Sequence, residues 1–138
     1  MEWKECKLRD YVKSTFIDNN LINSLIKNSE EKLDVNDLLK MNNSTSSTKF
    51  TIVYDSLREV LEALAVKKGF KIYNHECFSA FLNEIFGNKL FAEDFNKFRK
   101  IRNAINYCAK KISPEESIIM IKEMIDLRKK LLGELKKI

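Results

Sequence analysis

Residues that break helices are scarce in this chain, and that scarcity is its strongest constraint on the fold. Among 138 residues there are three glycines and one proline, and no stretch shows the period-two alternation of a half-buried strand. Apolar residues instead recur every three or four positions over long segments, which is the spacing of one helix face. The sequence therefore predicts an all-α protein without a β-sheet.

Local signals predict where the helices begin and end. Gly69 and Gly87 each follow an apolar-periodic segment, and Gly69 suits the left-handed conformation that ends a helix. Ser113, Pro114 and Glu116 form the spacing of a capping box with proline in the first turn. The predicted helices cover approximately residues 3–12, 19–40 (with a break near Ser29 as one option), 48–68, 75–86, 91–110 and 114–137.

The helix lengths suggest how the helices pack. At about 1.5 Å per residue the last helix is roughly 35 Å long, and the helix over residues 48–68 is similar. Long helices with short connections pack well as antiparallel bundles. We expect one domain over residues 1–138, built as an up-and-down four-helix-type bundle with additional N-terminal helices.

Composition excludes several classes of protein. No run of apolar residues is long enough to span a membrane, and the first residues do not resemble a signal peptide. The three cysteines have no close spacing, so they are expected as reduced thiols without a zinc or disulfide framework. No phosphate-binding glycine loop, metal-ligand motif or nucleophile elbow is present. These features predict a cytoplasmic protein without metal or cofactor, and without a membrane partner.

The helix predicted over residues 91–110 carries two contrasting faces. Its apolar face includes Phe98, Ile101, Ile105 and Cys108, and Cys108 is therefore expected to be buried. The six basic residues between Lys97 and Lys111 occur without an acid, in a chain of net charge +5. A basic polar face of this kind suits RNA or a nucleotide, whereas a solvated lysine-rich surface is the alternative. The residues of the polar face, called here the polar stripe, are Arg99, Arg102, Asn103, Asn106, Tyr107 and Lys110.

Two further predictions concern single basic residues. His75 is the only histidine and stands at a helix start, where Asn74 can cap and Glu76 suits the helix dipole. A structural role for His75 and a role as acid, base or RNA contact both remain open. Arg128 lies in a basic run of the last helix and is expected on the solvated surface.

The segment from Phe98 to Tyr107 resembles the signature helix of the HEPN superfamily, whose members are small all-α bundles with an Arg-Asn-x-x-x-His pattern. The surrounding order is also similar: a long helix containing Tyr54 to Ala65, then Lys68 to Lys71, then Asn74 to Glu76 opening a short helix, and a long terminal helix. The resemblance covers residues 45–138. Residues 1–44 form an additional N-terminal helical arm outside it.

The resemblance implies roles for particular residues. Arg102 matches the signature arginine, Asn103 the polar residue after it, and Tyr107 stands where the family has histidine. Active members are thought to pair as dimers whose arginine and histidine cleave RNA without metal. Tyrosine, with a pKa near 10, is a poor proton shuttle at pH 7, although it can stack on a base. The resemblance therefore implies a non-catalytic or altered homodimeric member, with Arg102, Asn103, Tyr107 and His75 as the catalytic candidates if activity remains.

Three functions follow as hypotheses. In the first, the polar stripe binds RNA or a nucleotide in a dimer groove. In the second, the protein is a metal-independent endoribonuclease that uses Arg102 and His75, which requires His75 to approach Arg102. In the third, it is the partner of a minimal nucleotidyltransferase in a toxin–antitoxin-like pair, and Arg102 is neutralised by one of three carboxylates on the preceding long helix. Those carboxylates are Asp55, Glu59 and Glu62.

Overall fold

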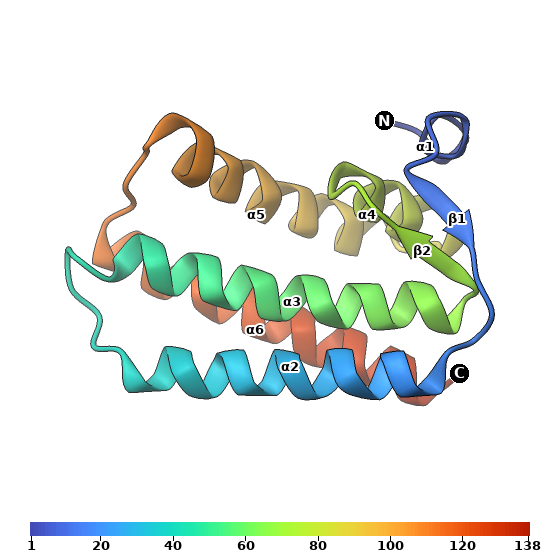
Figure 1. Cartoon of the computed structure of the whole chain (residues 1–138). Coiled ribbons are helices and arrows are strands. Elements are labelled where there is room, and N and C mark those ends of the chain that lie inside the picture. The colour runs from blue at the N-terminus through green and yellow to red at the C-terminus, as the bar shows by residue number, and fades with distance from the viewer.

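The computed structural model describes all 138 residues, and most of them are helical (Figure 1). The prediction of an all-α protein is therefore confirmed, apart from one small two-stranded sheet. The elements are α1 Trp3–Leu8, β1 Val12–Ser14, α2 Asn19–Leu38, α3 Ser46–Lys67, β2 Phe70–Ile72, α4 Glu76–Ala80, the π-helix η1 Phe81–Ile85, α5 Lys89–Cys108 and α6 Pro114–Lys136.

Helix α3 is the central element of the fold. Helices α2 and α6 both pack along it, and α5 runs on the side of α3 opposite α2 (Figure 1). The short connection over residues 39–45 reverses the chain, so that α2 and α3 are antiparallel neighbours (Figure 1). No helix has an apolar run of the length needed to cross a membrane.

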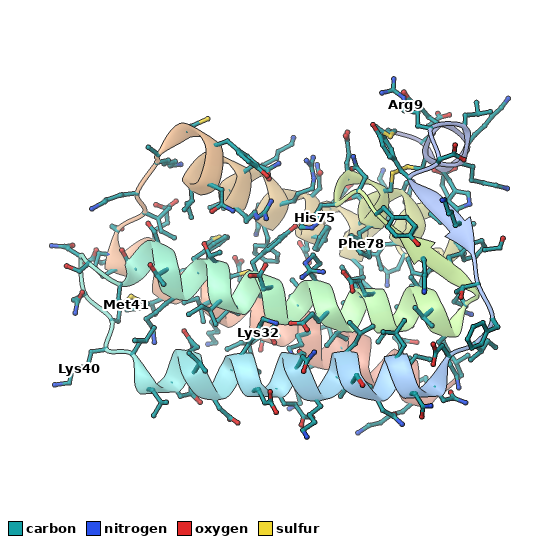
Figure 2. The ribbon with its side chains drawn as sticks, viewed as in Figure 1. Arg9, Lys32, Lys40, Met41, His75 and Phe78 are labelled. Atoms are coloured by element: carbon teal, nitrogen blue, oxygen red, sulfur yellow. A yellow bond between two sulfur atoms is a disulfide. The ribbon has the colours of Figure 1, made fainter.

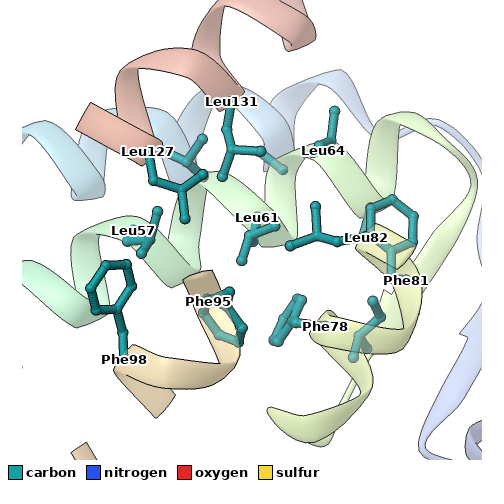
Figure 3. Close-up of a cluster of buried hydrophobic side chains, with 14 of the residues drawn as sticks. Leu57, Leu61, Leu64, Phe78, Phe81, Leu82, Phe95, Phe98, Leu127 and Leu131 are labelled. Carbon is teal, nitrogen blue, oxygen red and sulfur yellow. The ribbon is translucent and has the colours of Figure 1, made fainter. Parts of the chain in front are cut away.

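The core forms where α3 meets α4, η1, α5 and α6 (Figure 3). One face of α3 is buried throughout, and it carries Tyr54, Leu57, Leu61, Leu64 and Ala65. Aromatic rings from the other elements fill the space beside that face. The core side chains labelled in Figure 3 are Leu57, Leu61, Leu64, Phe78, Phe81, Leu82, Phe95, Phe98, Leu127 and Leu131.

The strongest local signals of the sequence are confirmed. Ser113 Oγ accepts a hydrogen bond from the Glu116 backbone N–H at 3.1 Å, and Pro114 begins α6. Gly69 and Gly87 follow α3 and η1 with φ of 91° and 81°, a region that an L-residue avoids because of its Cβ. These features depend on residues within one helical turn of each other.

The sheet is a correction to the prediction. Strand β1 pairs with β2 antiparallel, with Val12 opposite Ile72, and the helix expected over residues 3–12 ends at Leu8. Asp10 turns the chain with φ of 58°, which a helix cannot accommodate. Three-residue strands are too short to show alternation, and each strand's partner lies far away in sequence. The pattern of the sequence could not reveal them.

The cysteine prediction is also wrong in part. Cys6 of α1 and Cys77 of α4 form a disulfide across 71 residues, with their Cα atoms 6.0 Å apart. Helix α1 lies against α4, and its Trp3 also contacts the adjoining η1, where the backbone N–H donates to Glu84 at 2.7 Å and the ring packs on Phe81. This contact brings together two thiols that sequence spacing did not connect. The prediction of a cytoplasmic location loses one of its premises.

A buried polar cluster joins α2, α3 and α6. Ser29 Oγ donates to the Ser56 carbonyl at 2.8 Å, and α2 continues through Ser29 without the break considered above. Arg128 Nε donates to Ser29 Oγ at 2.8 Å, and Arg128 is buried rather than solvated. Arg128 is thus buried next to a serine hydroxyl of α2. Its spacing along α6 alone did not predict this contact.

Candidate functional site

The structure divides the polar stripe of α5 into two parts. Arg99, Arg102 and Asn103 are half-buried on α5, against which α4 and α3 pack. Asn106 and Tyr107 are exposed on the last turn of that helix, and Tyr107 is 75% exposed. The last stripe residue, Lys110, is exposed beyond the end of α5 at Cys108.

The guanidinium of Arg102 lies between two aromatic rings. Its Cζ is 5.7 Å from the centre of the Tyr54 ring on α3 and 5.8 Å from the centre of the Tyr107 ring. These are cation–π distances, which favour a fixed guanidinium orientation. Nη1 donates to Asn103 Oδ1 at 3.2 Å, whereas Nε is buried without any hydrogen-bond partner. Arg102 therefore makes only one side-chain hydrogen bond within the protein.

None of the carboxylates expected to neutralise Arg102 does so, and this prediction is wrong. Glu59 pairs with Lys32, Glu62 pairs with Arg58, and Asp55 forms no ion pair. Glu59 and Glu62 are therefore paired within α3 or between α2 and α3 rather than with α5. Arg102 remains an unneutralised cation in a half-buried position.

Arg99 is held in a similar way one turn earlier on α5. Its Nε and Nη2 both donate to Asn96 Oδ1, at 3.1 and 2.7 Å, and it forms no ion pair. A neutral amide can orient a guanidinium without cancelling its charge. Arg99 and Arg102 thus present two oriented positive charges on the side of α5 that faces α4.

His75 meets this cluster from the start of α4 and lies in the space between α3 and α5 (Figure 2). Its Nδ1 is 3.0 Å from Tyr54 Oη, and its ring lies at a steep angle to the Phe78 ring with centres 6.1 Å apart. Nε2 makes no hydrogen bond within the protein. The expected capping by Asn74 is confirmed, since Asn74 Oδ1 accepts the Glu76 N–H at 2.9 Å.

The electrostatic environment keeps His75 and Tyr54 neutral at pH 7. Burial, together with the guanidiniums of Arg58, Arg102 and Arg99, lowers the pKa of His75 to about 4. Burial raises the pKa of Tyr54 well above its ordinary value, and the nearby arginines only partly oppose that effect. The site therefore combines positive guanidiniums with a neutral imidazole and a neutral phenol, and its net charge is positive.

Sequence reasoning missed Tyr54 and Arg58 as members of this cluster. Tyr54 is spaced with the apolar residues of α3 and is buried among them. The signal that could have found it is its hydroxyl, because a buried phenol needs a hydrogen-bond partner. The partner, His75, is 21 residues away in sequence, and only the packing of α4 beside α3 brings the two together.

The remaining chemistry of the region is limited. No group of three or more histidine, cysteine or acidic side chains lies close enough together to hold a metal ion. Cys108, expected on the buried face of α5, is exposed because the end of that helix extends beyond its neighbours. Positive groups with free hydrogen-bond donors, next to a neutral imidazole, are suited to binding an oxyanion such as a phosphate.

Comparison with protein-family models, with curated proteins and with solved structures finds no match to this chain. A functional interpretation therefore depends on the geometry of the site itself. Among the residues singled out from the sequence, that geometry brings together four: Arg99, Arg102, Asn103 and His75. It leaves Asn106, Tyr107 and Lys110 on the exposed end of the same region.

Proposed function

We propose that this chain is an altered, non-catalytic HEPN-like domain that binds an RNA or nucleotide phosphate at Arg99 and Arg102. The single observation that carries the proposal is that both guanidiniums are half-buried, oriented by amides and free of carboxylate partners. A half-buried charge without a counter-ion is unfavourable unless a ligand supplies one. Phosphate oxygens match the fork of guanidinium donors, which makes a phosphate the natural ligand.

The surroundings of the two arginines favour a nucleic acid over a free anion. Tyr107 is exposed beside Arg102 and offers a ring on which a base can stack. Lys110 and Asn106 extend the polar surface along the end of α5. Single-stranded binding commonly combines phosphate-binding cations with exposed aromatic rings in this way.

The resemblance to HEPN proteins adds two features to the proposal. The helices over residues 45–138 form the up-and-down bundle of that superfamily, and residues 1–44 are an addition to it. Two copies pair through the end of α5, so that the exposed Asn106, Tyr107 and Lys110 of each copy line a shared groove. A nucleotidyltransferase partner remains a separate prediction, which a pulldown from cells of the source organism would test.

The binding proposal is tested with a pair of charge-matched double variants. Arg99→Ala with Arg102→Ala removes two charges from the site, and Lys129→Ala with Lys130→Ala removes two from the exposed surface of α6. We expect the arginine variant to bind a fluorescent single-stranded RNA about tenfold more weakly. The slope of log affinity against log salt concentration should also become shallower, by an amount that corresponds to about one phosphate contact or more. The lysine variant should stay close to wild type. Equal affinity of the two double variants would refute the proposal.

A second candidate function, metal-independent RNA cleavage, is favoured by one observation. His75 lies in the same cluster as Arg102, which that hypothesis required. A bound phosphate would favour the protonated imidazole and raise its pKa toward the range useful for acid–base chemistry. If RNA incubated with the protein is cleaved in the presence of a chelator, and His75→Ala abolishes cleavage, the enzyme hypothesis replaces the non-catalytic one.

A further inference from the structure

An open cavity of about 410 Å³ lies between the α4–η1 segment and α5. Arg99 lines it at one end, and the N-terminal residues Met1 and Glu2 border it near α4. Its volume falls within the range of pockets that hold small organic ligands. Arg99 is also one of the two arginines of the proposed phosphate site, so the cavity and that site share this residue.

The interior of the cavity combines small apolar residues with polar side chains, one of which has no hydrogen-bond partner. Ala80 and Ala92 are buried side chains of the two facing helices, and their small size leaves space between the helix backbones. Ser79 Oγ is buried without a hydrogen-bond partner in the protein. The amides of Asn83 and Asn96 also line the cavity, so donors and acceptors surround a narrow apolar surface. This combination suits a flat heterocycle with polar edges.

Some charged side chains of the cavity wall have ion-pair partners within the protein, and others have none. Four glutamates line the wall, and two of them form ion pairs with cations of the protein. Glu2 forms no ion pair, and neither do Arg99 and Lys100. Carboxylates and cations both line the wall, and the cations without an ion-pair partner, Arg99 and Lys100, both lie on α5. The satisfied pairs are Glu76 with the N-terminal ammonium at 3.4 Å, Glu84 with the Trp3 N–H at 2.7 Å, and Glu93 with Lys89 at 3.9 Å.

The backbone on one side of the cavity is irregular. Residues Phe81–Ile85 form a π-helix directly after α4, and Asn83 and Glu84 of that segment line the cavity. A π-helical turn is uncommon and is retained most often where it positions side chains for a ligand. Here the π-helix places Asn83 and Glu84 in the wall that also includes Ser79.

We infer that this cavity binds the nucleoside attached to the phosphate held by Arg99 and Arg102, an inference that rests on the proposed function. The phosphate occupies the end formed by Arg99 and Lys100. The ribose and base lie between α4 and α5, with their hydrogen-bonding edges toward Ser79, Asn83 and Asn96. The preferred ligand is a ribonucleotide unit rather than a bare phosphate group.

The test compares AMP with ribose 5-phosphate, which has the same phosphate and sugar but no base. We expect calorimetric titration of the full chain to give at least about tenfold tighter binding of AMP. Ala92→Leu fills the cavity and should remove this advantage. Asn83→Leu, at an exposed position of the cavity wall, is the second variant should Ala92→Leu fail to fold. Ala104→Leu, on the same helix but outside the cavity, is the matched control and should keep the advantage.

The outcomes separate this inference from the function on which it rests. Equal binding of AMP and ribose 5-phosphate to the wild-type chain, with both lost in Arg99→Ala, overturns the nucleoside site and leaves the phosphate site intact. Persistence of the AMP advantage in the cavity variants also overturns it. If neither compound binds the wild-type chain, the phosphate site and the nucleoside site both fail.

Discussion

At the scale of single residues, the protonation of His75 depends on groups from two other helices. Burial and the guanidiniums of Arg58, Arg102 and Arg99 lower its pKa to about 4, whereas an unfolded chain has a histidine pKa near 6.5. Between these values the unfolded state binds a proton that the folded state does not. His75 therefore contributes stability that is fully present above pH 6.5 and is lost as the pH falls through about 4.

This linkage predicts the behaviour of His75→Gln. Lowering the pH from about 7 to about 4.5 reduces the free energy of unfolding of both proteins. We expect the reduction to be smaller in the variant by about 1–2 kcal/mol, after allowing for partial exposure of the ring. Chemical denaturation at both pH values measures the difference. All other titrating groups are shared by the two proteins, so parallel pH profiles would show that His75 is not held neutral.

At the scale of elements, the start of α6 illustrates stabilisation by purely local interactions. Ser113 Oγ accepts the Glu116 N–H at 3.1 Å, and Pro114 occupies the first turn, where its missing N–H has no cost. The Ser113 side chain is exposed, so a substitution there changes the helix cap without disturbing the core.

Replacement of Ser113 by alanine should destabilise the protein by about 1 kcal/mol, because a first-turn amide loses its acceptor. Ser113→Asp restores an acceptor and should stay near wild-type stability. Urea denaturation of the three proteins measures both effects. If alanine and aspartate behave alike, the cap makes no net contribution to the stability of α6.

At the scale of the whole molecule, the N-terminal segment is tied to the rest of the fold by covalent and non-covalent links. The disulfide joins Cys6 to Cys77, two residues from His75, and β1 pairs with β2 directly before the same helix. A crosslink over 71 residues restricts the unfolded chain more than the folded one. The position of α4, and with it His75, depends on this attachment.

We therefore expect Cys6→Ala with Cys77→Ala to lower the free energy of unfolding by about 2–4 kcal/mol. Cys108→Ala is the control, because that thiol is exposed and unpaired, and it should have no effect. Thermal unfolding compares the variants. Thiol titration of the denatured, unreduced wild-type chain should give one free thiol, whereas three would contradict the disulfide.

The helices could be predicted largely from the sequence, because their causes lie within a few residues. The apolar face of α3, the glycines after α3 and η1, and the cap of α6 each follow from contacts inside one or two turns. The strands β1 and β2 could not be predicted, since each is only three residues long and has a partner far away in sequence. The same distance concealed the disulfide between Cys6 and Cys77.

For the candidate site, the sequence by itself determined that Arg99, Arg102 and Asn103 share a face of one helix, because helical periodicity alone specifies that relation. Only the tertiary structure decided what that face meets. It placed His75 and Tyr54 beside Arg102, paired Glu59 and Glu62 with other cations, and opened a cavity next to Arg99. Ion pairing and burial depend on neighbours from distant parts of the chain, and no local pattern specifies them.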